Sequence, residues 1–257
     1  DVEPAGDSQV AAIGRNDGDD PNVQRWHQII NYLNIKNNII DSSANTSIGK
    51  LAFLGFCSDE GVRRNQGRVG AKDGPATIRK ACSSFPVHFE KIQLFDAGDV
   101  VCDNGDLEEA QTMLGEKVHQ LISNHFFPIV LGGGHEVAFG NFCGVQQQSK
   151  NAYGVINFDA HFDLRCVDEN VGATSGTGFW QMAQITKNNH INFEYLAIGV
   201  QQYSNTKKLF QTAKELGVLH VLGEELIHHQ LEHLLHLIDQ VLDKSDVIQL
   251  SIDMDVF

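Results

Sequence analysis

Short apolar segments alternate with longer amphipathic segments along residues 50–257, and this alternation limits the choice of fold more than any other feature of the chain. The apolar segments lack the polar alternation of half-exposed strands, which predicts strands buried on both faces. Within residues 106–124, Leu107, Leu114 and Val118 recur at helical spacing. The predicted strands are 51–56, 92–95, 127–131, 153–158, 195–199, 218–221 and 247–252. The predicted helices are 23–33, 75–84, 106–124, 136–148, 179–187, 205–216 and 224–243.

This strand–helix alternation predicts an α/β fold with a mainly parallel sheet and helices on both of its faces. No linker rich in Pro, Gly or Ser interrupts residues 50–257, and no internal repeat is found there. We therefore expect a single domain over residues 21–257. The preceding residues 1–20 are rich in Gly and Asp, and we expect them to form a flexible lead-in.

The balance of charges excludes several classes of partner. The chain has 33 acidic and 19 basic residues, a formal net charge of −14, so we expect neither nucleic acid nor an anionic membrane surface as partner. No apolar run approaches the ~20 residues of a membrane span, and residues 1–20 lack the pattern of a signal peptide. Five dispersed cysteines without a C-x-x-C pair indicate a reducing compartment, which predicts a cytoplasmic protein.

Polar side chains follow three of the predicted strands at the point where each strand ends, which is where parallel sheets bind ligands. The segment 128–135 leaves its strand through three glycines, the segment 157–163 carries acidic residues and a histidine at alternate positions, and the segment 250–255 carries two aspartates at alternate positions. Alternate residues of an extended segment point to one side, so these side chains should converge. They are His135, Asp159, His161, Asp163, Asp253 and Asp255.

Taken singly, each segment has an ordinary explanation, because a lone histidine is usually structural and a polar strand end is usually solvated. Together, four carboxylates and two imidazoles would be costly to bury without a cation. Carboxylate oxygens with a minority of imidazole suit Mn²⁺, with Fe²⁺, Co²⁺ or Zn²⁺ as alternatives. Six ligands exceed the needs of one ion and favour two ions that share bridging carboxylates. Such a pair activates water, so the residues predict metal-assisted hydrolysis.

The stretches GGGH at 132–135, DAHFD at 159–163 and SIDMD at 251–255 resemble, in order and approximate spacing, the metal motifs of the ureohydrolase family of arginases, agmatinases and formimidoylglutamases. The resemblance covers about residues 51–257. It implies the arginase-like fold, a three-layer αβα architecture, and two Mn²⁺ ions that assist hydrolysis of guanidino or formimino C–N bonds. By motif position, the resemblance assigns one ion to His135, Asp159, Asp163 and Asp253. It assigns the other ion to Asp159, His161, Asp253 and Asp255.

Departures from the arginase pattern make the chain most similar to formimidoylglutamases. Arg165 stands where arginases carry an asparagine, and Phe179 stands where they carry a histidine that shuttles protons. These changes suit an anionic, amino-acid-derived substrate, whose carboxylate Arg165 would bind bidentately. Ser175, in the same stretch as Phe179, is a further substrate-binding candidate. An arginine-rich loop at 59–70 also resembles formimidoylglutamases, and its candidates are Arg63, Arg64 and Arg68.

The resemblance implies hydrolysis of N-formimidoyl-L-glutamate to L-glutamate and formamide, a step of histidine degradation, with Asp163 delivering a proton to the leaving nitrogen. One alternative is an arginase- or agmatinase-type hydrolase that releases urea, and another is a non-catalytic metal-binding relative. Family members continue past the position of Phe257, so we expect the domain to lack its C-terminal segment here. The sequence leaves a homo-oligomer open.

Overall fold

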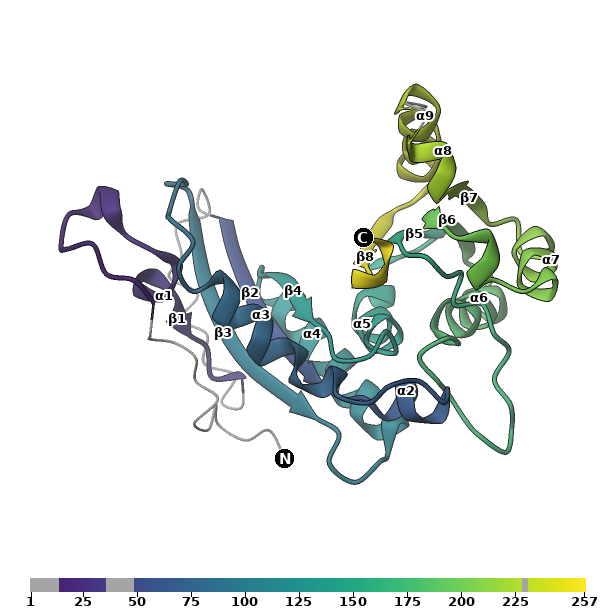
Figure 1. Cartoon of the computed structure of the whole chain (residues 1–257), viewed down its shortest axis with the longest axis horizontal. Coiled ribbons are helices and arrows are strands. Elements are labelled where there is room, and N and C mark those ends of the chain that lie inside the picture. Colours follow the sequence, from purple (N-terminus) through teal and green to yellow (C-terminus); the bar gives the residue numbers. More distant parts are fainter. Residues whose placement is uncertain (1–13, 36–48, 228–230) are drawn as a thin grey trace. The chain divides into compact units, whose positions relative to one another are not determined.

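The computed structural model describes residues 14–35, 49–227 and 231–257, which fall into two compact units, Asp1–Gly144 and Val145–Phe257 (Figure 1). Each unit contains a four-stranded sheet flanked by helices, and every pairing between the described strands is parallel. The predicted α/β class is therefore confirmed in both units. The expectation of a single domain stays a prediction, and residues 1–13 of the expected lead-in lie outside the described residues.

The first unit orders its strands β1-β3-β2-β4. They are β1 (Asn31–Tyr32), β2 (Gly49–Cys57), β3 (Ile92–Val101) and β4 (Phe127–Leu131). The helices are α1 (Trp26–Ile29), α2 (Glu60–Arg64), α3 (Gly74–Cys82), α4 (Leu107–Ser123) and α5 (Val137–Val145). The helix α4 begins where the Asp106 carboxylate accepts a hydrogen bond from the backbone N–H of Glu109 at 2.9 Å. Its buried face carries the periodic apolar residues from which it was predicted.

The second unit orders its strands β7-β6-β5-β8. They are β5 (Ala152–Phe158), β6 (Asn192–Val200), β7 (Leu219–Leu222) and β8 (Val247–Ile252). The helices are α6 (Gly178–Asn188), α7 (Lys207–Glu215), α8 (Gly223–Ile227) and α9 (Leu231–Lys244). Short 3₁₀ turns complete the described elements, at Pro21–Val23, Ala71–Asp73, Gln146–Gln148, Gln202–Ser204 and Met254–Val256.

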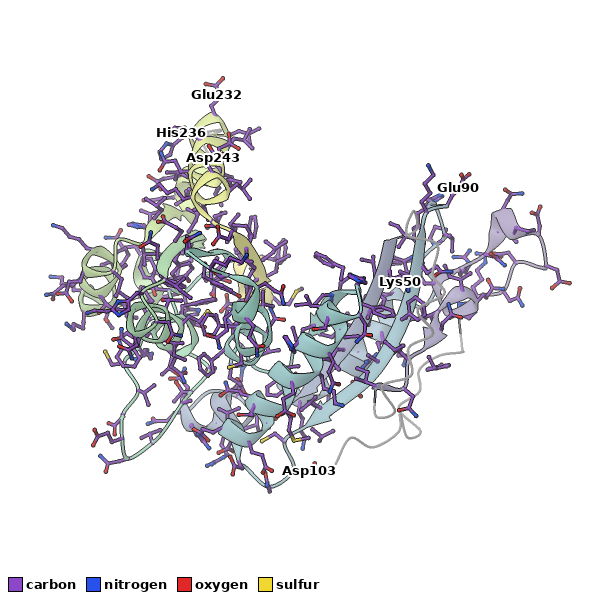
Figure 2. The ribbon with its side chains drawn as sticks, turned by 180° about the vertical axis from the view of Figure 1, so that it is seen from behind. Lys50, Glu90, Asp103, Glu232, His236 and Asp243 are labelled. Atoms are coloured by element: carbon purple, nitrogen blue, oxygen red, sulfur yellow. The ribbon has the colours of Figure 1, made fainter. Side chains whose placement is uncertain are left out.

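The core of the second unit lies between its sheet and α9. Apolar residues of β5, β6 and β7 pack against one face of α9, through Leu237 and Val241. Glu232, His236 and Asp243, labelled in Figure 2, are exposed residues of this helix. In the sheet, Phe158 of β5 pairs with both Ile198 of β6 and Ile252 of β8, so the segments that follow β5 and β8 leave the sheet at the same edge.

Most predicted elements are confirmed within a few residues, and the differences have physical causes. The strand β3 runs to Val101, well past the predicted end at 95, because a bulge opposite Phe53 and Gly55 lets pairing with β2 resume. The helix predicted at 23–33 is wrong apart from Trp26–Ile29, since Asn31 and Tyr32 pair with β3 instead. The helix predicted at 224–243 corresponds to α8 and α9, with residues 228–230 outside the described part. None of the described helices is long and apolar enough to cross a membrane.

Candidate metal centre

Asp159 is the first residue after β5, and its carboxylate is buried at the end of the sheet. Its backbone N–H donates to the carbonyl of Ile198 at 2.9 Å, which keeps it in register with β6. The side chain is fully buried. Its Oδ1 accepts from the backbone N–H of His161 at 2.7 Å, and its Oδ2 accepts from Asn157 Nδ2 at 3.0 Å. A buried carboxylate is costly without a neutralising positive charge, so a cation is expected at this position.

His161 and Asp255 lie beside this carboxylate. The Nδ1 atom of His161 is 2.9 Å from Asp255 Oδ2 and 3.5 Å from Asp159 Oδ1. Hydrogen bonds that the His161 imidazolium donates to Asp159 and Asp255 raise the pKa of His161 to about 10, so in the absence of metal the imidazolium itself is the cation between them. One potential ligand atom from each residue lies within 4.8 Å of the other two. Two carboxylates and one imidazole, converging from two strand ends, form a donor set that fits a divalent metal of the Mn²⁺ class.

The remaining aspartates shape the same two segments. Asp253 continues from β8 by donating its backbone N–H to Phe158 O at 2.8 Å, and its Oδ1 accepts from the backbone N–H of Asp255 at 3.1 Å. Asp163 is half-buried and has a φ of +48°, in the left-handed region that few residues other than glycine adopt. Backbone strain of this kind is concentrated at functional sites.

His135 belongs to the first unit, in the loop between β4 and α5, where its carbonyl accepts from the N–H of Ala138 at 3.0 Å. The structure thus brings together Asp159, His161 and Asp255 within the second unit, with Asp163 and Asp253 on the same two segments. The assignment of all six residues as ligands stays a prediction.

The glycine run before His135 is required by close approach of β2. A Cβ atom on Gly133 would lie 2.0 Å from the carbonyl oxygen of Ser58, and one on Gly134 would lie 2.0 Å from Glu136 Oε2. A side chain at Gly133 would push the loop away from the backbone at the end of β2, and one at Gly134 would displace the side chains of Glu136 and Val62. The backbone N–H of Gly134 donates to the carbonyl of Ser58 at 2.8 Å, which fastens the loop where the glycines allow it.

Glu136 was missed by the sequence reasoning, although a carboxylate directly before an apolar helix is an available signal. It is fully buried, and its Oε1 accepts from Ser58 Oγ at 3.0 Å and from the backbone N–H of Gly61 at 2.9 Å. Its Oε2 has no hydrogen-bond partner among the described residues. Burial raises the pKa of this carboxyl group. Glu136 therefore attaches α2, which begins the arginine-rich loop, to the loop that carries His135.

Two of the predicted substrate-binding arginines are paired with acidic residues of their own unit. Arg63 contacts Glu60 at 2.6 Å, and Arg64 contacts Glu60 at 2.9 Å and Glu108 at 2.7 Å. Arg68 is exposed, and within the described part of the chain no carboxylate forms an ion pair with it. A role in substrate binding stays a prediction for all three arginines, and the positive charge of Arg63 and Arg64 is already offset.

Arg165 and Ser175 lie on segments that are tied together. The backbone N–H of Arg165 donates to the carbonyl of Gly176 at 2.9 Å, which sets Arg165 beside the turn that contains Ser175. The guanidinium of Arg165 is exposed and has no ion-pair partner in the ranges that the structure describes. Phe179 is buried, with its ring centroid 4.7 Å from that of Tyr195, so it packs in the core.

Asn205 is a second residue that sequence reasoning missed. It is buried, its Nδ2 donates to the carbonyl of Ala160 at 2.9 Å, and its Oδ1 accepts from the backbone N–H of Phe162 at 3.1 Å. It therefore fixes the backbone immediately before and after His161. No local sequence pattern predicts this contact, because it joins residues 45 positions apart.

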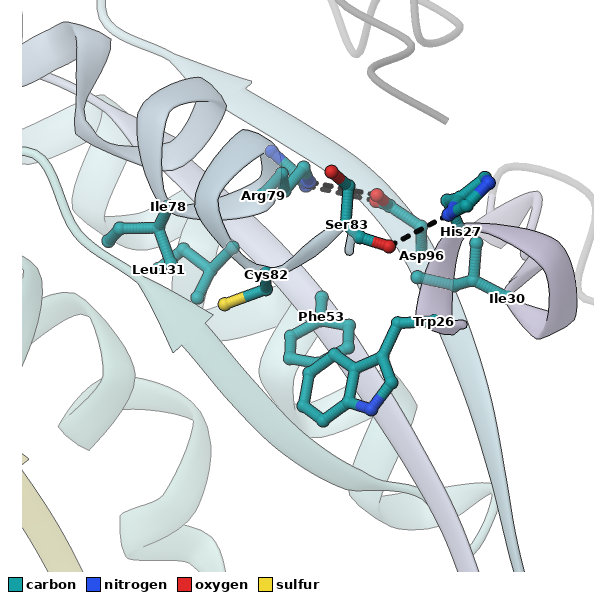
Figure 3. A pocket seen from close by; sticks show the side chains of 10 residues that line it. All are labelled: Trp26, His27, Ile30, Phe53, Ile78, Arg79, Cys82, Ser83, Asp96 and Leu131. Carbon is teal, nitrogen blue, oxygen red and sulfur yellow. Dashed lines mark hydrogen bonds and ion pairs between the residues drawn. The ribbon is translucent and has the colours of Figure 1, made fainter. Parts of the chain in front are cut away.

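None of the predicted site residues lines the apolar pocket of the first unit. In this pocket, Trp26 of α1 and Cys82 of α3 face Phe53 of β2 (Figure 3). At its polar side, Arg79 contacts Asp96 at 2.8 Å, as the dashed lines in Figure 3 mark. The pocket has the composition of a gap in a hydrophobic core, and no function is assigned to it.

The comparisons with known proteins agree with this fold. The arginase family model matches residues 49–257, and the chain belongs to the arginase family. The formimidoylglutamase of Clostridium tetani is 42% identical over 251 residues, which cover 95% of this chain and 73% of the relative. The formimidoylglutamase of Chromobacterium violaceum is 44% identical over 235 residues, 91% of this chain and 72% of the relative. The family resemblance predicted from the motifs is therefore confirmed.

Solved structures extend the likeness to the fold. A formimidoylglutamase from Bacillus subtilis matches with a TM-score of 0.74 at 24% identity, over 93% of this chain and 73% of that one. A Trypanosoma cruzi formiminoglutamase, solved with Mn²⁺, matches with a TM-score of 0.64 at 25% identity, over 77% of this chain and 69% of that one. These matches confirm the predicted arginase-like α/β fold.

Proposed function

We propose that this protein hydrolyses a C–N bond of a linear amidine, with N-formimidoyl-L-glutamate as its substrate. The observation that carries the proposal is the convergence of Asp159, His161 and Asp255 at the ends of β5 and β8. The choice of substrate is supported by the relatives named formimidoylglutamase, two of which are 42% and 44% identical over more than nine-tenths of the chain. In this reaction water adds to the formimino carbon, the bond to the glutamate nitrogen breaks, and formamide and L-glutamate leave.

The proposed cofactor is a pair of Mn²⁺ ions. Its support is the mixed carboxylate and imidazole donor set, membership of the arginase family, and the Mn²⁺ of the Trypanosoma cruzi relative. Bound divalent ions of this kind lower the pKa of water and so supply a nucleophile at neutral pH. The residues proposed to hold them are those of the three motifs, namely His135, Asp159, His161, Asp163, Asp253 and Asp255.

Asp163, Arg165, Ser175 and the arginine-rich loop are proposed to act on the substrate directly. Asp163 delivers a proton to the nitrogen that leaves, a role that its position in the DAHFD motif supports through the family resemblance. Arg165 binds a substrate carboxylate through its exposed guanidinium, in the bidentate geometry that arginine favours. Ser175 is proposed as a neighbouring contact, because the Arg165–Gly176 hydrogen bond ties the two segments together. On the strength of its resemblance, the arginine-rich loop is proposed to contribute positive charge through Arg68, and its paired arginines Arg63 and Arg64 are proposed as further substrate contacts.

The test is hydrolysis by the Mn²⁺-reconstituted protein of formimidoylglutamate, arginine and agmatine, with formamide and urea both quantified. We expect formamide from the first substrate and no urea from the others. The variant Asp255→Asn should lose activity, whereas Asp243→Asn on the outer side of α9 should keep it. Urea from arginine or agmatine would favour the guanidino hydrolase, and tight Mn²⁺ binding without any product would favour a non-catalytic relative.

A further inference from the structure

A buried tyrosine hydroxyl supports the segment that carries Asp159 and His161. Tyr195 lies on β6, where it pairs with Val155 of β5, and it is 2% exposed. Its hydroxyl donates to the carbonyl of Phe162 at 3.0 Å and accepts from Asn157 Nδ2 at 3.2 Å. Burial is the main cause that raises the pKa of Tyr195 well above its usual value, so the hydroxyl keeps the proton it donates.

Asn157 connects this hydroxyl to the Asp159 carboxylate. The same Nδ2 atom donates to Tyr195 and, at 3.0 Å, to Asp159 Oδ2. Both hydrogens of the amide are therefore used, and both oxygens of Asp159 are held, one by Asn157 and one by the backbone of His161. The Oδ1 atom of Asn157 is buried without a hydrogen-bond partner in the described residues. An unpaired buried oxygen is costly, which indicates that the orientation of the amide is kept for its two donated bonds.

Aromatic packing fixes the tyrosine ring. The ring of Phe179 lies 4.7 Å from that of Tyr195, and the ring of Phe193 lies 5.8 Å from it. Phe179 thus supports the tyrosine from α6, while Asn157 and Phe162 receive its polar end. A side chain whose ring and hydroxyl are both in contact has a fixed position, and it can therefore orient the groups to which it is hydrogen-bonded.

We propose that Tyr195, acting through Asn157, is a positioning residue that holds Asp159 and the backbone of Phe162 in the arrangement required for metal binding. The proposal rests on the metal-binding part of the proposed function. A carboxylate that is already oriented loses less conformational freedom when a metal binds, and loss of such outer contacts typically lowers metal affinity by about 10- to 100-fold. Removal of the hydroxyl would leave the carbonyl of Phe162 without its donor and free the Asn157 amide to turn.

The second unit offers a matched control. Tyr153 lies on β5 of the same sheet, is fully buried, and donates its hydroxyl to Gln249 Oε1 at 2.7 Å. The variants Tyr195→Phe and Tyr153→Phe therefore delete the same atom, and the same kind of buried hydrogen bond, from neighbouring strands. Only the first deletion removes hydrogen bonds to Asn157 and Phe162, which flank Asp159 and His161 along the chain. A purely structural role for Tyr195 predicts equal effects on metal affinity.

The experiment measures the affinity of the metal-free protein for Mn²⁺ by competition with a chelator, together with the thermal midpoint. We expect Tyr195→Phe to weaken Mn²⁺ binding by about 10- to 100-fold, with Tyr153→Phe within about threefold of the wild type at a similar thermal midpoint. Asn157→Ala, which breaks the link and leaves the Tyr195 hydroxyl in place, should also weaken binding at least tenfold, and it serves as the test if Tyr195→Phe does not fold. Equal affinities of the two tyrosine variants, or an unchanged affinity in Asn157→Ala, would overturn the proposal. Wild-type protein that binds no Mn²⁺ would defeat both proposals, whereas Mn²⁺ binding without formamide would defeat the proposed function alone.

Discussion

Replacement of Glu136 by alanine should loosen the start of α2, because it removes the acceptor that holds this helix to the loop before α5. The carboxyl group is fully buried and accepts from Ser58 Oγ at 3.0 Å and from the backbone N–H of Gly61 at 2.9 Å. Gly61 is itself buried, so its N–H cannot form a replacement hydrogen bond with solvent. The expected result is local opening of residues 58–64 ahead of the rest of the first unit.

The magnitude follows from the Gly61 hydrogen bond. A buried donor that loses its partner costs about 1–3 kcal/mol. Because about 1.4 kcal/mol corresponds to a factor of ten, the Gly61 amide should exchange its hydrogen about 5- to 150-fold faster. Glutamine keeps an acceptor oxygen in the position of Oε1 and is neutral, as the raised pKa of Glu136 favours. Glu136→Gln should therefore exchange within about threefold of the wild type.

The assay is hydrogen exchange followed by mass spectrometry on peptides that cover residues 58–70, with peptides from β8 as an internal reference. The control is Glu108→Ala, which removes an exposed carboxylate that also contacts α2 through Arg64 at 2.7 Å. An exposed ion pair contributes at most about 1 kcal/mol, so this control should change exchange little. Unchanged exchange in Glu136→Ala would refute the reasoning, and equally fast exchange in Glu136→Gln would show that charge, and not the hydrogen bond, secures α2.

Three further results are expected. Arg165→Met should raise the KM for formimidoylglutamate by about 10- to 150-fold with kcat nearly unchanged, because a hydrogen bond to a charged group contributes about 1.5–3 kcal/mol; an unchanged KM in steady-state kinetics would exclude carboxylate binding there. In chelated protein, Asp159 and Asp255 raise the pKa of His161 from 6.5 to about 10, so the contribution of this group to stability is fully present below pH 6.5 and is lost as the pH rises through 10. The denaturation midpoint of His161→Gln should lack this part of the decline, and parallel pH profiles of the variant and the wild type would contradict the pairing. Gly133→Ala places a Cβ atom 2.0 Å from a backbone oxygen, which should cost about 1–3 kcal/mol and lower the thermal midpoint by about 2–12 °C; an unchanged midpoint would contradict the close approach.

The elements and the polar strand ends were predictable from sequence because both depend on local pattern. Runs such as 153–158 contain no polar alternation, and β5 is buried throughout most of its length. The position of Asp159 directly after that run predicts a carboxylate at the sheet edge, and its convergence with Asp255 follows from the register of β5 with β8. The parallel arrangement of the strands was predicted from the alternation of strands and helices along the chain.

Partners that lie far apart along the chain were not predictable. The pairs of Glu60 with Arg63 and Arg64 are an exception, because a spacing of three and four positions is typical of ion pairs on a helix. From the sequence we interpreted these arginines as substrate ligands and did not consider pairing with Glu60. The contact of Arg64 with Glu108 spans 44 positions, and those of Glu136 with Gly61 and of Tyr195 with Phe162 span 75 and 33. Such contacts depend on how helices pack on the sheets, which periodicity does not describe.

The left-handed backbone of Asp163 determines which substitution can remove its carboxylate without straining the chain. With φ at +48°, aspartate and asparagine tolerate the conformation better than other residues that have a Cβ atom. Alanine at this position would combine two effects, the loss of a carboxylate and a strained turn in the segment that carries His161. Asparagine keeps the turn and removes only the acid. A scan by alanine would therefore exaggerate the importance of the proposed proton donor, and the comparison of the two variants separates the effect of the turn from that of the acid.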